Sequence, residues 1–435
     1  MQTSHRKLGA ALVALSLAAV TACGSGDGDT SAGGGTVTLS FLIDNSEPTV
    51  ATVKAIVDAF QKANPTIKIE TETRPQGTEG DNVVKTRLST GEMTDVFWYN
   101  SGSLLQALNP GQTLEDLTGD PVLGSVEKSF LPVVTQGGKV FGVPAGSAAG
   151  GGILYNRKVY AELGLQVPKT WAEFIANNEK IKASGRTAVI STFKDTWTSQ
   201  LFVLADFYNV QAAVPAFARD YTANKAKYAT TPAAAAGFGR LAEVHQKGYL
   251  NKGFGSAVLD DGLKLLVEGK GVHYPMLTLV LPPLLPKSPQ VTKDIGFFGI
   301  PGDDPAKHGA TIWEPAAVYI ATTTKRLDAA KKFLAFVASP AGTAAMTAAV
   351  PPTGPYRVVG ATLPADAMQA AKDVQAYIDD QISAPALEFV SPVKGPSLEQ
   401  ITVAVGSGLT APAEGAAQYD KDVEKQAKQL GLPGW

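Results

Sequence analysis

The sequence predicts an α/β protein with two lobes, and three observations carry this prediction. Strand-like and helix-like segments alternate from residue 36 onward, and the alternation returns after residue 150. The chain of 435 residues accommodates two or three folding units of about 100–200 residues each. Strands that alternate with helices are typical of a parallel sheet whose faces are covered by helices. We therefore expect two such blocks.

The first block begins with the segment TVTLSFLI (36–43), in which every second residue is apolar, as in a strand with one buried face. The helix that follows has its apolar residues on one face and ends at Asn64-Pro65. A strand at 67–69, a short helix that ends at Gly91 and the apolar strand DVFWY complete this block. The order strand, helix, strand, helix, strand predicts a parallel sheet.

The second block contains further strands and a marked helix start. Thr170 and Glu173 match a capping box, in which the N-cap side chain and the Glu side chain each accept a backbone N–H of the other residue. We expect strands at 153–155, 187–191, 271–274, 295–300 and 316–321. We expect helices at 197–209, 231–247, 256–267 and 327–338, and a mostly helical, Ala-rich remainder.

The composition excludes several classes of protein. Hydrophobic residues make up 44 % of the chain, enough to bury a core, which excludes intrinsic disorder. The net charge of −2 supplies no basic field for nucleic acid. One Cys excludes a disulfide framework and a Cys-based zinc site, and the four His form no H-E-x-x-H motif. We therefore expect neither a metal nor another cofactor.

The N-terminus predicts export. Three basic or imidazole side chains precede an apolar run of 13 residues, Leu8–Val20, which is shorter than the about 20 residues a membrane span needs. This order is typical of a signal peptide, here 1–22. The run leads into V-T-A-C, ending at Cys23, which resembles the lipobox whose Cys is diacylated in bacterial lipoproteins. The alternative is an ordinary secretory signal that happens to contain a Cys.

The segment 23–35 is expected to tether the chain to the membrane. After Cys23 it reads GSGDGDTSAGGG and has no apolar residue larger than Ala, which is typical of a flexible linker. Two acyl chains would hold a protein on a membrane, where one chain binds only reversibly. We expect a cell-membrane protein, anchored through lipid on the extracellular face.

Seven segments together resemble the family-1 extracellular solute-binding proteins, the sugar-binding components of ATP-driven importers. They occur in the family's order between about 36 and 360. They are AFQKANPTIKIE, TGEMTDVFWYN, GKVFGVP, ILYNRKVYAELGLQVPKTWAEF, VEGKGVHYPM, IGFFGIPG and AAVYIATTTKRLDAAKKFLAFVASP. Each segment is a weak signal alone, and seven in order are a strong one.

The resemblance implies a type II periplasmic-binding-protein-like fold with a ligand cleft between the lobes. Lobe 1 would hold 36–145 and 303–345, and lobe 2 would hold 146–302 and 346–435. It further implies a monomer that performs no catalysis, binds a carbohydrate, closes by a hinge and delivers its ligand to membrane permease subunits.

A carbohydrate site needs aromatic rings for the C–H faces of the sugar and polar side chains for its hydroxyl groups. Five candidates lie in the first block. Asp44 and Asn45 end the first strand, where helix capping is an equal alternative. Glu79 lies after the second strand, where a solvated loop is the alternative. Tyr99 and Asn100 end the third strand, and we expect the neighbouring Trp98 to face the core.

Six candidates lie in the rest of the chain. Trp197 opens a helix in KDTWTSQ, with Asp195 beside it, and core packing or capping are the alternatives. Tyr274 follows GKG at a point where many relatives carry a Trp. Trp313 and Glu314 form the strongest candidate pair, just before the strand AAVYIA. Arg357 follows PPTGP, and an ordinary surface cation is the alternative.

Other functions have weaker support. A hydrolase lacks G-x-S-x-G and H-x-E motifs, and V-E-G-K-G (267–271) departs from a P-loop. The same fold could bind a polyamine through Asp44, Glu79 and Glu314, or a glycerophosphodiester through Arg357. A lipoprotein that binds glycan without transport is a further alternative.

Overall fold

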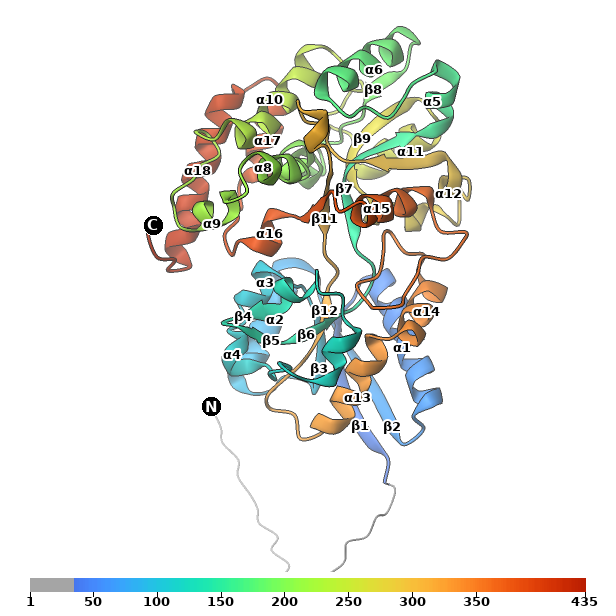
Figure 1. The fold of residues 1–435 in the computed structure, drawn as a ribbon, viewed down its shortest axis with the longest axis vertical. Helices are drawn as coiled ribbons and strands as arrows, with labels where there is room; N and C mark the ends of the chain where they lie inside the picture. The colour runs from blue at the N-terminus through green and yellow to red at the C-terminus, as the bar shows by residue number, and fades with distance from the viewer. Residues whose placement is uncertain (1–34) are drawn as a thin grey trace, which may run out of the picture. The chain divides into compact units, whose positions relative to one another are not determined.

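The computed structural model describes residues 35–435, and Thr36–Trp435 form one compact unit. The predicted signal peptide and Cys23 lie outside the described residues. Two large sheets, each with its own helices, make up two lobes, and a separate two-stranded sheet accompanies them (Figure 1). The α/β, two-lobed prediction is therefore confirmed.

The first sheet has the order β2-β1-β3-β12-β6. β1 (Val37–Asp44) pairs in parallel with β2 (Ile67–Arg74) and β3 (Val96–Tyr99), as the sequence predicts. The prediction of a parallel sheet is wrong for the other half. β12 (Ala317–Ile320) runs antiparallel to both β3 and β6 (Gly142–Pro144), because it enters from the other lobe.

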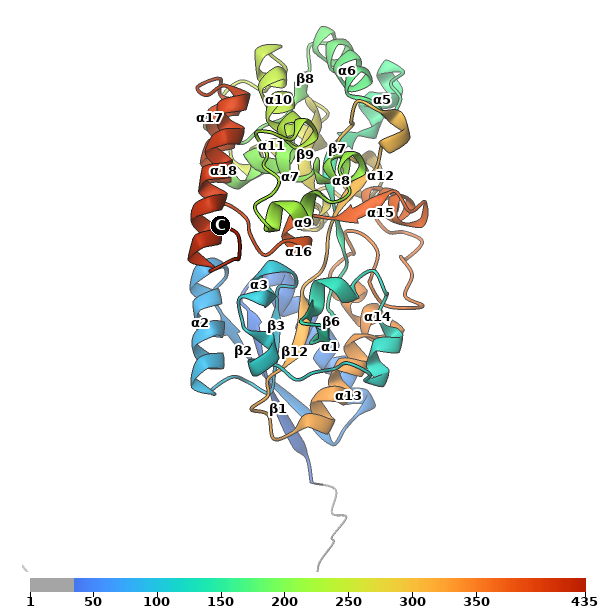
Figure 2. The same ribbon diagram turned by 60° about the vertical axis from the view of Figure 1, so that its left-hand side comes forward.

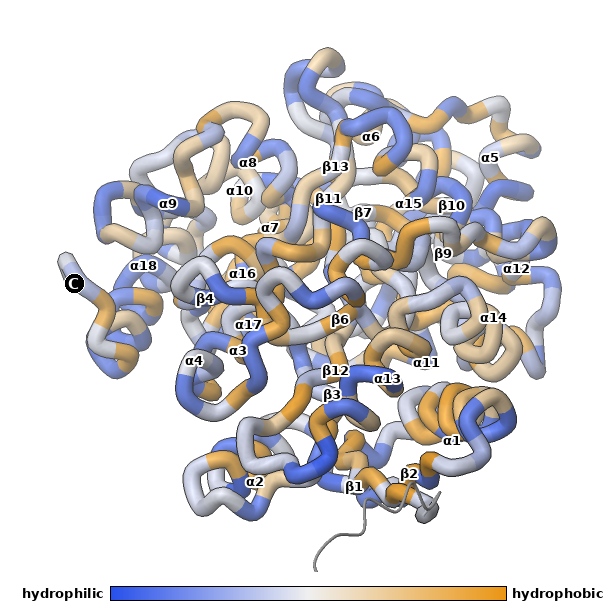
Figure 3. Tube along the Cα trace, turned by 60° about the horizontal axis from the view of Figure 1, so that its bottom comes forward, coloured by the Kyte–Doolittle hydropathy of each residue, from blue (hydrophilic) through white to orange (hydrophobic). Residues whose placement is uncertain are grey.

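Helices cover this sheet and build its core. Ser46 accepts a hydrogen bond from the Thr49 backbone N–H and caps α1 (Glu47–Ala63), which buries an apolar face. Figure 3 shows hydrophobic positions along this helix. Phe60 of α1 meets Phe333 of α13 edge to face, with ring centroids 5.1 Å apart. The remaining elements of this lobe are α2 (Gly77–Thr90), α3 (Ser103–Gln106), α4 (Pro110–Thr113), β4 (Thr135–Gln136), β5 (Lys139–Val140), α13 (Leu327–Val337) and α14 (Pro340–Ala349).

The second sheet is built around β7 (Ala149–Asn156). Its order is β13-β11-β7-β9-β8, and β10 also pairs with β7. β7 runs antiparallel to β9, β10 and β11, so this sheet is mixed and not parallel. The bounds are β8 (Thr187–Val189), β9 (Gly271–Leu277), β10 (Ile295–Phe298), β11 (Ala310–Trp313) and β13 (Ser383–Pro385).

Helices surround this sheet as well. The predicted capping box at Thr170 and Glu173 is present and begins α6. The helices are α5 (Arg157–Leu163), α6 (Trp171–Ala183), α7 (Leu201–Leu204), α8 (Phe207–Ala213), α9 (Phe217–Thr222), α10 (Pro232–Gln246), α11 (Leu259–Val267), α12 (Val291–Asp294), α15 (Gln369–Asp379), α16 (Leu387–Val390), α17 (Leu398–Gly406) and α18 (Pro412–Gln429).

Three segments join the two sheets. The chain passes from β6 to β7 through 145–148, from β11 to β12 through 314–316, and from α14 to α15 through 350–368. Because β11 belongs to the second sheet, the second crossing falls at 314–316 and not at the expected 303. α14 also extends the first-lobe segment to Ala349, beyond the expected 345. The views of Figures 1 and 2 place α3 and α16 on one side of these segments and α14 on the other.

Candidate functional site

Hydrogen bonds hold the joining segments together. The Thr353 backbone N–H donates to the Ser147 hydroxyl over 3.0 Å, and the Thr353 hydroxyl donates to the Ala148 carbonyl over 3.1 Å. The Ala145 N–H donates to the Ala316 carbonyl over 2.9 Å. All three crossings are therefore tied to one another where the two lobes meet.

A cavity of about 400 Å³ lies on one side of the joining segments, and we call it the polar cavity. Its volume falls in the range of small-molecule sites. Its wall combines hydroxyl, amide and carboxylate groups with two aromatic rings. The lining residues are Asn100, Ser101, Ser103, Leu104, Ser147, Ala149, Leu279, Trp313, Glu314, Pro315, Ala316, Thr353, Glu388 and Phe389.

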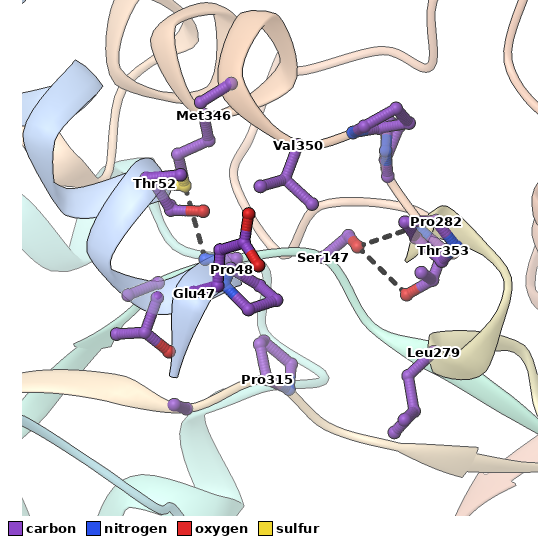
Figure 4. Close-up of a pocket in the computed structure, with 18 of the residues that line it drawn as sticks. Glu47, Pro48, Thr52, Ser147, Leu279, Pro282, Pro315, Met346, Val350 and Thr353 are labelled. Carbon is purple, nitrogen blue, oxygen red and sulfur yellow. Dashed lines mark hydrogen bonds between the residues drawn. The ribbon is translucent and has the colours of Figure 1, made fainter. Parts of the chain in front are cut away.

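A second cavity of about 630 Å³ shares five of these residues, and we call it the proline-lined cavity (Figure 4). Seven prolines, with Trp98, Met346 and Val350, give it a largely apolar wall. It lies against the start of α1 and the segment after α14. The shared residues are Ser147, Leu279, Pro315, Ala316 and Thr353.

Glu314 and Arg357 form a buried ion pair behind the polar cavity. Arg357 donates to both carboxylate oxygens of Glu314, from Nε to Oε2 and from Nη2 to Oε1, each over 2.7 Å. Both side chains are almost fully buried. Burial raises the pKa of the Glu314 carboxyl, and the Arg357 guanidinium opposes that rise. The carboxylate of Glu314 and the guanidinium of Arg357 therefore neutralise each other.

The second carboxylate of the polar cavity is also paired. Glu388 lies 3.4 Å from the ammonium group of Lys394, measured from Oε2 to Nζ. Both ionisable side chains of the polar cavity therefore have a cationic partner. The wall presents little net charge to an occupant.

Polar groups that could bind an occupant remain in this cavity. Asn100 is exposed at the end of β3, and its side-chain amide has no hydrogen-bond partner among residues 35–435. Ser101 is different, because its hydroxyl donates to the Pro315 carbonyl over 2.9 Å. Trp313 is half-buried at the end of β11 and offers a ring at the wall.

The structure brings four of the predicted site residues together. Asn100, Trp313 and Glu314 line the polar cavity, and Arg357 lies behind Glu314. Arg357 is buried, so the alternative of a surface cation is wrong. The pair Trp313 and Glu314 thus lies where the joining segment leaves β11.

The predicted residues at the ends of β1 and β2 line neither cavity. The Asp44 carboxylate accepts the Ser46 backbone N–H over 3.0 Å, which is the turn-forming alternative. Asn45 is exposed beside it. Glu79 is exposed in the first turn of α2, and not in a loop, because α2 already begins at Gly77.

Trp98 packs in the hydrophobic core, as the sequence predicts, and it also lines the proline-lined cavity, whereas Tyr99 lines neither cavity. Tyr99 is fully buried under Arg74, whose guanidinium carbon lies 5.3 Å from the ring centroid, and burial raises the pKa of its hydroxyl. Trp98 points to the opposite face and lines the proline-lined cavity. Alternation along a strand predicts opposite faces, but it does not tell which face is open when both are covered.

The remaining candidates lie within the second lobe, outside both cavities. The Asp195 carboxylate accepts the Leu259 backbone N–H over 2.6 Å and ties its loop to the start of α11. Trp197 packs against the apolar core. Tyr274 is buried, and its hydroxyl lies 2.6 Å from that of Thr192. For Trp197 the core-packing alternative fits the structure.

Several residues that line the polar cavity were not predicted from the sequence. Ser147 and Thr353 lie on the joining segments, which the lobe boundaries of the resemblance could have indicated. Leu279 stands just beyond Tyr274, near the expected aromatic position. Phe389 and Glu388 lie in the Ala-rich C-terminal part, where no motif marks them.

The described residues show neither a membrane span nor a metal cluster. Within residues 35–435, every helix is too short or too polar to cross a bilayer. Across the same residues, no three His, Cys, Asp or Glu side chains gather closely enough to hold a metal ion.

Comparison with known proteins places the chain in a family. Residues 44–344 match the model of the bacterial extracellular solute-binding proteins, which covers more than half of the chain. The multiple sugar-binding protein of Streptococcus mutans is 27 % identical over 306 residues, 69 % of this chain and 71 % of that protein.

Solved structures share the fold. The apo form of RafE from Streptococcus pneumoniae superposes with a TM-score of 0.75 at 21 % identity and covers 92 % of this chain and 100 % of that one. A chitin oligosaccharide binding protein superposes with a TM-score of 0.69 at 18 % identity over 91 % of this chain and 100 % of that one. With two lobes, three joining segments and a family match along most of its length, the chain belongs to the bacterial extracellular solute-binding proteins.

Proposed function

We propose that this chain captures an uncharged sugar or small oligosaccharide in the polar cavity and delivers it to the permease subunits of an ATP-driven importer. The observation that carries the proposal is the chemistry of that cavity. Trp313 and Phe389 supply rings, Asn100 supplies a free amide, and the two carboxylates are already paired with cations. Sugars need rings and neutral polar groups.

The relatives support the same ligand class. The Streptococcus mutans relative is a multiple sugar-binding protein, and one solved structure with this fold is RafE in complex with raffinose. The protein would perform no chemistry of its own. Binding would draw the two lobes together about the joining segments.

The charged alternatives have less support. A polyamine would need several free acidic groups around one cavity, but Asp44 and Glu79 lie outside it and Glu314 is paired with Arg357. A glycerophosphodiester would need a free cation, and Arg357 is engaged by Glu314. A glycan-binding role without transport has no observation in its favour.

The location of the protein is part of the proposal. A signal peptide at 1–22 and a diacylated Cys23 would anchor the chain on the extracellular face of the cell membrane, with 24–35 as the tether. The chain would act there as a monomer.

The test is a thermal unfolding screen of residues 24–435 against mono- and oligosaccharides, polyamines and glycerophosphodiesters. A ligand at 100 times its Kd adds about 2.7 kcal/mol to the free energy of unfolding. We expect sugars alone to raise the midpoint. A rise with polyamines or phosphodiesters only would contradict the proposed ligand.

Substitution of Trp313 locates the site. Trp313→Ala should weaken sugar binding by about 2 kcal/mol, or ~30-fold, because it removes a ring at the cavity wall. Trp435→Ala is the matched control, since Trp435 lines neither cavity. Isothermal titration measures both. An unchanged Kd for Trp313→Ala would place the sugar elsewhere.

A further inference from the structure

A third cavity lies within the second lobe, and we call it the lysine cavity. Its volume of about 440 Å³ falls in the range of small-molecule sites. The loop 251–257 forms one wall, and α11 with the turn after it, up to Lys270, forms the other. α11 packs on β9 (Figure 1). None of the residues that line the lysine cavity lines the polar cavity or the proline-lined cavity.

A buried amide at this wall has one end free. Asn251 lines the cavity, although it is only 4 % exposed. Its Oδ1 accepts the Ser191 backbone N–H over 2.8 Å, which identifies the oxygen end of the amide and leaves Nδ2 for the cavity. Nδ2 has no acceptor among residues 35–435 and is not one of the fully enclosed atoms, so an occupant can reach it. Because a buried donor without an acceptor costs free energy, an occupant that accepts this hydrogen bond would be favoured.

The free charges at this cavity are cationic. Lys252 of the loop and Lys264 of α11 come from different walls, are exposed, and take part in none of the ion pairs among residues 35–435. Lys270 and Glu268 pair with each other over 2.7 Å, from Nζ to Oε2. The Asp261 carboxylate accepts a backbone N–H at the start of α11 over 3.1 Å. The wall thus holds three lysines against two carboxylates, and both carboxylates are already engaged.

We propose that the lysine cavity binds the phosphate group of a small molecule. The Asn251 amide would donate a hydrogen bond to a phosphate oxygen, and the ammonium groups of Lys252 and Lys264 would pair with its charge. A phosphate group presents acceptor oxygens in several directions, which suits donors that come from two walls, and Lys binds phosphate as a compact point charge. This inference is independent of the proposed sugar site, because the two cavities share no residue.

The probe is inorganic phosphate, which replaces chloride at constant ionic strength so that general screening stays the same. It is added to the chain 24–435, which contains the compact unit Thr36–Trp435. Binding is followed by the backbone N–H resonances of the loop 251–257 and by the side-chain NH₂ resonances of Asn251. We expect these resonances to shift with a Kd of about 1–10 mM, because each exposed ion pair contributes little.

Substitution of Asn251 tests the buried donor. Asn251→Asp keeps an oxygen for the Ser191 N–H and replaces the free donor with a carboxylate oxygen, so it should abolish phosphate binding. Gln246→Glu is the matched control, because it adds the same charge at an exposed position of α10 outside the cavity. It should leave the Kd for phosphate unchanged. Asn251→Asp should leave sugar binding unchanged, because Asn251 does not line the polar cavity.

A second pair of variants tests the lysines and keeps the inference testable if Asn251→Asp does not fold. Lys252→Gln combined with Lys264→Gln should weaken phosphate binding about fivefold to tenfold. Its control is Lys180→Gln combined with Lys332→Gln, which removes two exposed lysines outside the cavity and should leave the Kd unchanged.

Four outcomes would overturn the inference. They are phosphate binding retained in Asn251→Asp, equal binding by the two double lysine variants, no shift up to about 50 mM phosphate, and a shift of the same size with chloride alone. Vesicles test a lipid source of the phosphate group. Sedimentation of the chain with phosphatidylglycerol vesicles but not with phosphatidylcholine vesicles, without binding of free phosphate, would assign the cavity to a lipid headgroup and overturn a small-molecule ligand.

Discussion

At the scale of single residues, Glu314 and Arg357 were both predicted to contact the ligand, but the structure pairs them with each other. This ion pair is expected to stabilise the fold. Removal of one partner leaves the other charge buried and alone. We expect Arg357→Met to lower the free energy of unfolding by about 3–5 kcal/mol. Glu314→Gln combined with Arg357→Met should recover much of that loss. Urea denaturation of both variants measures this, and equal losses would contradict the pairing argument.

Because His273 is buried, we expect the free energy of unfolding to fall at acidic pH. Its Nδ1–H donates to Asn178 Oδ1 over 2.7 Å, its Nε2 accepts from the Tyr160 hydroxyl over 2.5 Å, and burial lowers its pKa to about 3. In the unfolded chain the imidazole of His273 takes up a proton near pH 6.5, whereas in the folded protein it stays neutral to a much lower pH. The contribution of His273 to stability is therefore complete above pH 6.5.

Between pH 6.5 and pH 3, unfolding therefore binds a proton, and stability falls as the pH is lowered. The loss from His273 alone is about 2 kcal/mol between pH 6.5 and pH 5. Denaturation at a series of pH values measures the slope. His273→Gln should have a shallower slope, and an unchanged slope would assign the acid sensitivity to other groups.

At the scale of elements, β7 makes room for Trp313 through glycine. A Cβ at Gly151 would lie 2.0 Å from Trp313 Cζ3, and this ring atom belongs to the side chain that lines the polar cavity. We expect Gly151→Ala to cost about 1–3 kcal/mol of stability and to weaken sugar binding by displacing the ring.

The control for this prediction is Gly239→Ala in α10, where a Cβ meets nothing within 4 Å. That change should leave binding unchanged and stability equal or higher, because Ala favours a helix. Thermal unfolding and titration with the sugar test both variants. Normal sugar affinity in Gly151→Ala would show that Trp313 does not contact the ligand.

Elements were predicted well where their pattern is local. The capping box at Thr170, the alternation in β1 and the one-faced helix α13 each depend on neighbours in sequence. β11 and β13 were missed because each is short and gains its hydrogen bonds from a distant partner. The antiparallel direction of β12 was missed for the same reason.

At the scale of the whole molecule, the polar cavity is walled by segments from both sheets. If sugar draws them together, the radius of gyration should fall when sugar is added. Small-angle X-ray scattering without sugar and with sugar at about three times the Kd of the unsubstituted chain measures it. Trp313→Ala at the same sugar concentration is the control, and its radius should stay near the sugar-free value. Sugar binding with no change in radius would contradict closure.

The sequence by itself determined the fold class, the family resemblance and the local elements, because these depend on periodicity and on motifs that are contiguous in the chain. The sequence also predicted Trp313 and Glu314 as a candidate pair, because they interrupt an apolar stretch. Only the tertiary structure decided which side chains share a cavity. Asn100, Trp313 and Phe389 come from three distant segments, and Arg357 reaches Glu314 from a fourth. Contacts between such distant segments depend on where the joining segments cross between the lobes. The spacing of residues along the chain does not determine these crossing points.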